Sequence, residues 1–351
     1  MYNGVKVLDV HGHVSAPGNN SAAQVGLMMA SNTALRSPLK VGQSASAPGL
    51  SDDDFRRTGQ NHVDLLDDRQ IDVQIIGPRP FLMMGWMQPH LLPGWARFVN
   101  DTIAKQVELF PDRFLGAAML PQISTAPDLG HCLPELERCH KELGFVAAYL
   151  SPDPAGQRTT PGMHEKYWDP VYAYCEQNDL PIIVHGTNSL DPRIGIIPQN
   201  YQIGFVTEQY LATQLLSHGD VFERFPGLRV VVCHCGGALD RFIKTDPHLS
   251  QKDLSKNLFF DTNALDLDFL EAAIKQRGVS QTCFGTEVPG SGRAVRPETG
   301  RPGDDLVPVI SAFPFLSEED KIAIFNGNPL KVLPAFARLQ GSARTPAAAG
   351  A

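Results

Sequence analysis

The residues best suited to chemistry in this 351-residue chain are two histidines near its N-terminus, in the sequence Asp-Val-His-Gly-His. Residues two apart on a β-strand share a face, so His11 and His13 project to one side and can bind one cation at ~2.0–2.1 Å. A single histidine at the end of a strand is more often a hydrogen-bonded polar residue than a metal ligand. The positions of the other candidates along the chain therefore decide between the two. Three more candidate ligands follow short apolar runs farther along the chain: His185, His234 and Glu287.

The apolar runs predict the elements that position these side chains. They are short, rich in β-branched residues and alternate with longer amphipathic stretches, which is typical of βα units around a parallel sheet. Eight such units close a (β/α)8 TIM barrel, an α/β fold whose active site lies at the C-terminal ends of the strands. All five candidate ligands fall there. We expect the eight strands at 5–10, 72–77, 115–120, 145–150, 181–184, 229–233, 258–262 and 282–285.

Helices and loops are predicted from spacing and composition. Val99, Ile103, Val107 and Phe110 recur at helical intervals and predict a helix with one apolar face between the second and third strands. Two segments exceed a minimal βα unit. We expect residues 14–60, with a short helix at 22–34, to be an insertion that caps the barrel mouth, and 289–305 to be a long loop after the eighth strand. The prediction is one barrel over 1–340 and a disordered tail over 341–351.

Composition narrows the class of partner. Thirty Lys and Arg against 38 Asp and Glu give a formal charge of −8, which argues against nucleic acid and anionic membranes as partners. We see no apolar run of membrane-spanning length and no signal peptide. The six cysteines form no CxxC pair, so we expect reduced thiols. We therefore expect a cytoplasmic protein with a small anionic ligand, and base rates favour a homodimer or higher homo-oligomer.

Strand parity suggests roles for the neighbours of the candidate ligands. Asp9 has the parity of His11 and His13 but lies deeper, so we favour a buried role in which it orients a ligand, with a hydrogen bond at the start of the strand as the alternative. Around His234, alternation would turn Cys233 and Cys235 to the opposite face, against the helices. We expect both cysteines to be packing residues.

With these motifs in place, the chain resembles the amidohydrolase superfamily, in the branch that contains aminocarboxymuconate-semialdehyde decarboxylase. Members carry HxH on strand one, His on strand five, HxGG on strand six and an acid on strand eight. The resemblance is nearest to 4-oxalomesaconate hydratases and to metal-dependent C–C hydrolases of ring-cleavage products, which share a glutamate at the last position. This sequence has Cys235 where the family's HGGG version has glycine. The matching residues are His11/His13, His185, His234 with Gly236-Gly237, and Glu287.

We assign the candidate residues to roles on this basis. His11, His13, His185 and Glu287 are taken as ligands of Zn²⁺, with Mn²⁺ as the alternative. His234 is then left for general acid or base work, because its ordinary pKa of ~6.5 lies near working pH. The predicted catalytic residues are His234, Glu287 and Asp9.

The resemblance implies an anionic substrate, and arginine matches a carboxylate with two parallel hydrogen bonds. Three arginines follow strands two and eight, where they can face the barrel mouth, although loop arginines are often simply solvated. They are Arg79, Arg293 and Arg296.

The leading hypothesis is an enzyme that adds water to an unsaturated oxo-dicarboxylate from aromatic ring cleavage, by C=C hydration or C–C hydrolysis. The alternative on the same scaffold is a decarboxylase of an aromatic or muconate-type acid. From a different class, the chain could be a barrel that only binds a small anion. The complete ligand set favours an enzyme.

Overall fold

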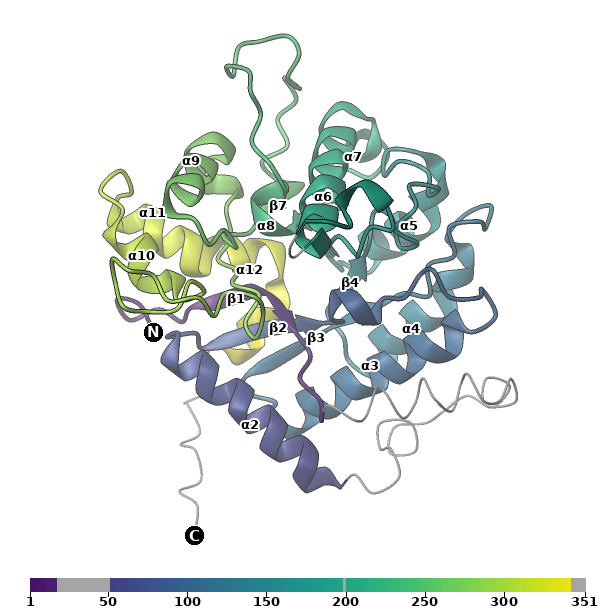
Figure 1. Ribbon diagram of the computed structural model, residues 1–351, viewed down its shortest axis with the longest axis horizontal. Coiled ribbons are helices and arrows are strands. Elements are labelled where there is room, and N and C mark those ends of the chain that lie inside the picture. Colours follow the sequence, from purple (N-terminus) through teal and green to yellow (C-terminus); the bar gives the residue numbers. More distant parts are fainter. Residues whose placement is uncertain (18–50, 198–199, 342–351) are drawn as a thin grey trace.

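The computed structural model describes residues 1–17, 51–197 and 200–341. Its centre is one curled sheet of seven parallel strands that pair in sequence order (Figure 1). All seven are buried along their whole length, as expected for a parallel sheet covered by helices. The strands are β1 (Leu8–His13), β2 (Val73–Gly77), β3 (Phe114–Met119), β4 (Ala147–Leu150), β5 (Ile182–Val184), β6 (Val230–Val232) and β7 (Leu258–Phe260).

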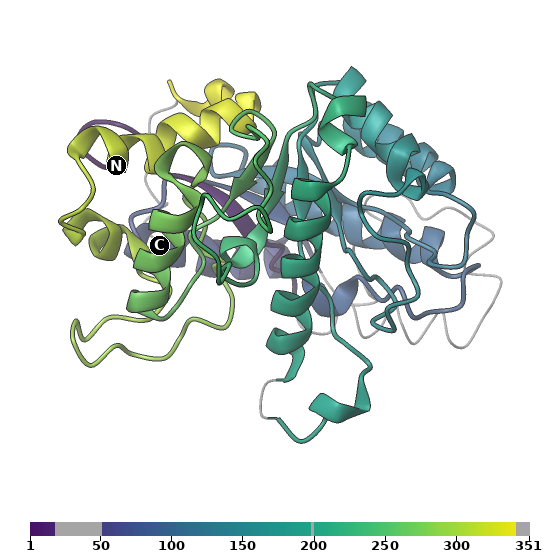
Figure 2. The same ribbon diagram turned by 90° about the horizontal axis from the view of Figure 1, so that it is seen from above.

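Helices follow the strands and surround the sheet, as the view in Figure 2 shows. The longest is α6, which carries residues of the site at one end. The helices are α2 (Asp52–Asp68), α3 (Leu92–Leu109), α4 (Leu133–Lys141), α5 (Asp169–Gln177), α6 (Asn200–His218), α7 (Val221–Arg224), the turn α8 (Cys233–Gly236), α9 (Leu267–Arg277), α10 (Leu306–Ala312), α11 (Glu318–Ile322) and α12 (Asn328–Val332).

The segment predicted as the eighth strand lies between the two edges of the sheet. On one side the Cys283 N–H donates to the Phe260 oxygen of β7, 2.8 Å away, and on the other the Val10 N–H of β1 donates to the Phe284 oxygen, 2.9 Å away. The structure shows only an isolated bridge here, between Phe260 and Thr282, and no eighth strand. The observed sheet therefore has seven strands, against the eight expected.

The other predicted elements agree with the structure to within a few residues. The first seven predicted strands overlap β1 to β7, although β1 extends to His13 and so includes both of its histidines. The helix predicted from Val99 and Ile103 is α3, and both side chains are buried. Within the predicted 14–60 insertion, α2 already begins at Asp52. The helix expected at 22–34 and all but the first residue of the expected tail lie outside the described residues.

Helix α2 begins at a capping box, in which the Ser51 hydroxyl accepts from the Asp54 N–H and the Asp54 carboxylate accepts from the Ser51 N–H. Its buried side chains face the interior, among them His62. No helix in the described ranges is both long and apolar enough to cross a bilayer.

The packing of Gly116 gives a test of the sheet. This glycine pairs with Ile76 of β2, and a Cβ at its position would lie 2.5 Å from a ring carbon of Phe145, which is 2% exposed. Because the ring has no room to move, we expect Gly116→Ala to lower the free energy of unfolding by about 1–3 kcal/mol. The readout is the midpoint of thermal unfolding.

The matched control is Gly327→Ala. Gly327 has helical backbone angles and no atom within 4 Å of an added Cβ. Alanine is the better helix former, so this variant is expected to unfold at the wild-type temperature or above it. A wild-type midpoint for Gly116→Ala would contradict the packing described here.

Candidate metal and active site

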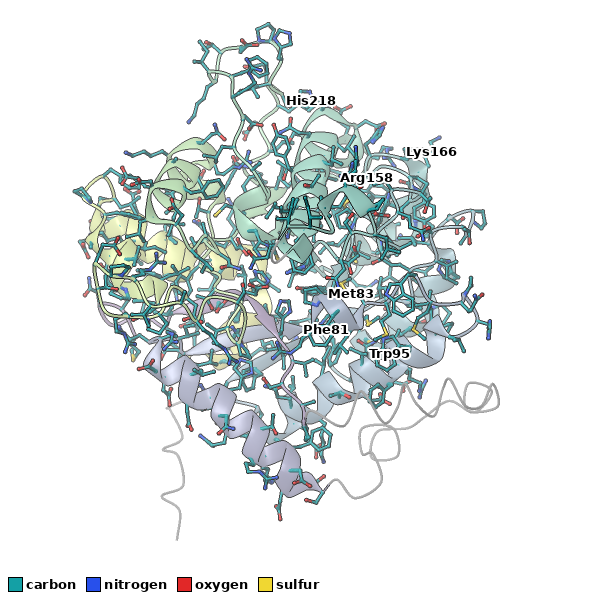
Figure 3. The ribbon with its side chains drawn as sticks, viewed as in Figure 1. Phe81, Met83, Trp95, Arg158, Lys166 and His218 are labelled. Atoms are coloured by element: carbon teal, nitrogen blue, oxygen red, sulfur yellow. The ribbon has the colours of Figure 1, made fainter. Side chains whose placement is uncertain are left out.

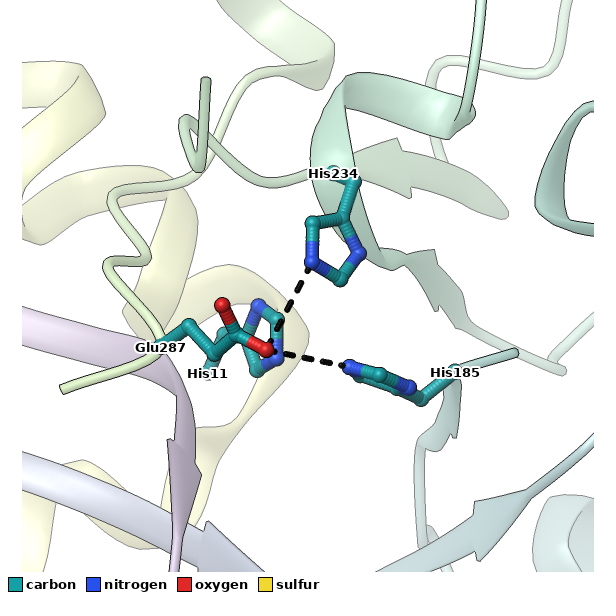
Figure 4. A group of neighbouring side chains, drawn as sticks. All are labelled: His11, His185, His234 and Glu287. Atoms are coloured by element: carbon teal, nitrogen blue, oxygen red, sulfur yellow. Dashed lines mark ion pairs between the residues drawn. The ribbon is translucent and has the colours of Figure 1, made fainter. Parts of the chain in front are cut away.

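Four imidazoles lie around one carboxylate where the strands end, and Figure 4 shows three of them, His11, His185 and His234, with Glu287. Oε1 of Glu287 is 3.4 Å from Nε2 of His13, 3.8 Å from Nε2 of His185 and 3.7 Å from Nε2 of His234. His11 completes the group, with its ring centroid about 5 Å from those of the other three histidines. The structure thus brings together all five side chains that the sequence singled out as candidate ligands.

Three of these histidines are oriented alike. Nδ1 of His11 donates to Asp261, Nδ1 of His13 to the Pro78 oxygen and Nδ1 of His185 to the Gly186 oxygen. Each Nδ1 therefore carries the proton, and each Nε2 presents a lone pair. These three Nε2 atoms are buried and have no hydrogen-bond partner among the described residues, which is costly unless something binds them.

The donor set fits a divalent metal ion. The ligand atoms of His11, His185, His234 and Glu287 all lie within 4.8 Å of one another. Two atoms bonded to one ion at ~2.1 Å are at most about 4.2 Å apart, so small shifts of the side chains would bring the group onto one ion. This group includes His234 and leaves out His13, although Nε2 of His13 lies only 3.4 Å from Oε1 of Glu287.

His234 differs from the other three in its hydrogen bond. Its Nδ1 accepts from the side-chain amide of Gln209, 3.0 Å away. With this orientation of the Gln209 amide, the neutral ring has its proton on Nε2, the atom that faces Glu287. That tautomer lacks the lone pair that a metal needs, which separates His234 from His11, His13 and His185.

The electrostatics show the same difference. Burial lowers the pKa of His13 and of His185 to about 4, so both rings are neutral at ordinary pH. Burial also acts on His234, but Glu287 and Asp261 outweigh it and raise its pKa above the usual value. Burial alone would raise the pKa of Glu287, yet the surrounding histidines, with the positive charge that His234 gains on protonation, hold it well below its ordinary range.

Asp261 is the functional residue that the sequence analysis missed. It lies just after β7, with Oδ2 2.6 Å from Nδ1 of His11, while Oδ1 accepts from the N–H groups of Cys235 and Asn263. A carboxylate that holds the far nitrogen of a ligand histidine fixes its tautomer and orientation. The sequence signal that could have identified it is its place as an acidic residue near the end of the predicted strand 258–262.

The parity argument for Cys233 is wrong. His234 and Cys235 have φ of 52° and 56°, so strand alternation stops at Val232. Cys233 instead faces the interior, where its sulfur, His11 and Asp261 offer ligand atoms within 4.8 Å of one another. The thiol has a pKa raised far above normal by burial and by Asp261, so it stays protonated.

Asp9 supports the backbone of the site and does not touch an imidazole. Its carboxylate accepts from the N–H of His11 at 2.8 Å, from the Thr286 hydroxyl at 2.5 Å and from the Gln74 amide at 2.9 Å. Gln74 in turn contacts His62 of α2, whose pKa burial lowers to about 3. This network ties β1 to the segment before Glu287, which is the second of the two readings of Asp9.

The backbone is strained at two of the site residues. His234 has a φ of 52° and Glu287 a φ of 62°, in the left-handed region that favours glycine. Such residues cost about 1 kcal/mol or more each and gather at functional sites. The turn at Glu287 is held by its own N–H, which donates to the His11 oxygen 2.8 Å away.

A cavity of about 410 Å³ opens beside the carboxylate, and Arg79 is its cation. Arg79 donates from Nε to the Val14 oxygen and from Nη1 to the Pro289 oxygen, so its position is fixed. Arg79 directly precedes the short helix η2 (Pro80–Leu82). The indole N–H of Trp95 in α3 donates to the Leu82 oxygen and so holds this helix in place. Figure 3 labels Trp95 together with Phe81 and Met83. The cavity is lined by His13, Arg79, Pro80, Phe81, Asn188, Phe205, Glu287, Gly290 and Ser291.

The other two predicted arginines lie differently. Arg293 is exposed on the loop after Glu287, near enough for its charge to lower the pKa of Arg79, although burial is the larger cause of that shift. Arg296 is buried and donates to the backbone oxygens of Leu265 and Gly303. Arg296 thus holds its loop together, which differs from the substrate contact predicted for it.

Comparison with known proteins agrees with this geometry. The family model described as Amidohydrolase matches residues 8–335. The chain is similar to a 2-keto-4-carboxy-3-hexenedioate hydratase of Sphingobium sp., at 33% identity over 85% of this chain and 89% of that protein.

Two solved structures are also similar. The 4-oxalomesaconate hydratase of Rhodopseudomonas palustris has a TM-score of 0.78 and 29% identity, over 95% of this chain and 97% of that one. A dihydroxybenzoic acid decarboxylase from Polaromonas sp., solved with bound manganese and 2-nitroresorcinol, has a TM-score of 0.64 and 20% identity, over 94% and 97% of the two chains. The second likeness shows the fold alone.

The contact between His11 and Asp261 predicts an effect on metal affinity. Asp261→Asn keeps the shape of the side chain but removes the charge that holds the proton on Nδ1 of His11. We expect metal affinity to fall by about 10–100-fold, measured by competition with a chelator of known affinity. As a matched control, Asp253→Asn on the surface should bind as wild type does. Equal affinity in both variants would show that Asp261 does not orient a ligand.

Proposed function

This chain belongs to the amidohydrolase family, and on that premise we propose that it is a metal-dependent enzyme that adds water to an unsaturated oxo-dicarboxylate made by cleavage of an aromatic ring. The observation that carries the proposal is the set of three unpaired, buried imidazole nitrogens grouped around Glu287, which itself lines a cavity with a fixed arginine. The similarity to a hydratase over most of both chains supports water addition by C=C hydration or C–C hydrolysis.

We propose that His11, His13, His185 and Glu287 hold Zn²⁺, with Mn²⁺ as the alternative. Neutral imidazoles with a carboxylate suit either ion, and the manganese in the similar decarboxylase structure supports the second. When bound, such an ion lowers the pKa of water toward ~7 and polarises a substrate carbonyl. We also propose that residues 282–285 complete an eight-stranded barrel, since they bond to strands on both sides.

The residues around the cavity are assigned separate roles in binding substrate, excluding water and moving a proton. Arg79 binds one substrate carboxylate, because two of its donors are already held by backbone oxygens and its charge faces the cavity. Phe81 and Phe205 line the same cavity and exclude water from the bound substrate. His234 moves a proton at Nε2, the atom that faces Glu287, since its pKa lies above the usual value while those of its neighbours lie below.

A decarboxylase on the same scaffold is the second candidate, because the chain shares the fold of the dihydroxybenzoic acid decarboxylase. The two functions differ in products. Water addition without cleavage raises the substrate mass by one water, and C–C hydrolysis gives two fragments whose masses sum to that value. Decarboxylation releases CO₂.

Metal content provides the first experiment. Protein purified without added metal is expected to contain about one Zn or Mn per chain by inductively coupled plasma mass spectrometry, and His185→Ala and Glu287→Ala are expected to lose it. Glu319→Ala, on the exposed first turn of α11, serves as the control and keeps its metal. A well-folded wild type that takes up no metal even after reconstitution would instead favour the anion-binding barrel.

The role of His234 provides the second experiment. We expect His234→Asn to lower kcat for hydration of an unsaturated oxo-dicarboxylate by about 10²–10⁴-fold while metal content stays at the wild-type level. Because His234 lies among the possible metal ligands, a change in metal content would also be informative. Loss of the metal together with activity would make His234 a ligand and leave Glu287 as the candidate for proton transfer.

A further inference from the structure

The partner of His234 differs in kind from the partners of the other three histidines. Their Nδ1 atoms face groups that accept, namely one carboxylate and two backbone oxygens. Nδ1 of His234 faces the amide of Gln209 on α6, which can donate from Nε2 or accept at Oε1. Gln209 is fully buried, and its Oε1 has no hydrogen-bond partner among the described residues. The contact with His234 therefore governs which way this amide points.

Two glycines bring Gln209 to the ring. Turn α8 packs against α6, and the Thr213 hydroxyl of α6 donates to the Gly236 oxygen 3.2 Å away. At Gly237, an added Cβ would lie 2.2 Å from a backbone oxygen of α6, and its φ of 85° also favours glycine. These glycines allow the helix to come close enough for Nε2 of Gln209 to lie 3.0 Å from Nδ1 of His234.

The hydrogen bond at one ring nitrogen determines which nitrogen of a neutral imidazole carries the proton. While Nε2 of Gln209 donates to Nδ1, the proton of His234 stays on its own Nε2. The ring can then donate to an oxygen in the cavity, but it has no lone pair there for a metal ion. If Oε1 of Gln209 accepted from Nδ1 instead, the lone pair would lie on Nε2, as it does in the other three histidines.

We propose that Gln209 is a positioning residue for His234 and that the orientation of its amide decides which ring nitrogen carries the proton. In the observed orientation, His234 is a hydrogen-bond donor and stays outside the group that holds the metal ion. The inference rests on the proposed function, in which one of four neighbouring imidazoles is kept free for the substrate.

Proton transfer at Nε2 of His234 requires the other orientation. A neutral ring that gave up its Nε2 proton would become an imidazolate anion unless Nδ1 carried a proton as well. A ring with a proton on Nδ1 can take a second proton from water at Nε2, pass it to the substrate and return to its neutral form. The buried Oε1 of Gln209 is the acceptor that such a ring needs at Nδ1.

Exchange of the amide for a group that only accepts tests the inference. Gln209→Glu has nearly the same shape, and its carboxylate should draw the proton of His234 to Nδ1. The readout is the pair of imidazole ¹⁵N shifts of His234 in alkaline solution, where the ring is neutral, assigned by their loss in His234→Asn. We expect the proton on Nε2 in the wild type and on Nδ1 in Gln209→Glu. Either ring with the opposite tautomer would overturn the inference.

Two further variants complete the test. Gln157→Glu makes the same exchange at an exposed position and should keep the wild-type shifts. Gln209→Met keeps the length of the side chain without charge, donor or acceptor, and it also covers a failure of Gln209→Glu to fold. We expect its shifts to move toward those of a mixture of both tautomers. Wild-type shifts in Gln209→Met would show that Glu287 alone sets the tautomer and would overturn the inference.

Metal binding and turnover are separate readouts. Gln209→Glu is expected to change the visible absorption of bound Co²⁺, because a fourth imidazole becomes available to the ion. Gln209→Met is expected to keep its metal content and to lower kcat for hydration by about tenfold or more, and a wild-type kcat would overturn the positioning role. The tautomer is read in metal-free and zinc-loaded protein alike. A protein that binds no metal would therefore overturn the proposed function, while the ¹⁵N shifts would still decide whether Gln209 sets the tautomer.

Discussion

The site depends on keeping uncharged imidazole nitrogens buried and aimed at one carboxylate. Taking such nitrogens out of water without partners costs free energy, and the surrounding structure holds the rings in this orientation. Asp261 and the oxygens of Pro78 and Gly186 accept the protons of three rings, so each lone pair is turned inward. The sheet makes this possible because parallel strands end at one edge, where β1, β5 and β7 deliver their side chains to the same point.

Much of this arrangement could be predicted from the sequence. The alternation of apolar runs located seven strands, and the five candidate ligands are neighbours in space because each stands at the end of a run. Spacing along one strand says little about contacts between strands, however. Asp261 contacts His11 across 250 residues, and only the curl of the sheet brings the two together.

Other errors have local causes. Strand parity misplaced Cys233 because two residues with positive φ follow it, a feature that pattern rules for strands do not contain. Arg296 was expected to face substrate because of its position in a loop, yet its guanidinium donates hydrogen bonds to the backbone oxygens of Leu265 and Gly303.

The left-handed backbone at His234 and Glu287 has a consequence for engineering. Glycine and asparagine adopt that conformation at lower cost than histidine or glutamate, so the native residues spend stability at two positions for the sake of function. Laboratory selection for heat resistance alone would favour exchanging them and would return robust but inert proteins. Improvement of this chain as a biocatalyst therefore requires that each round of selection include turnover.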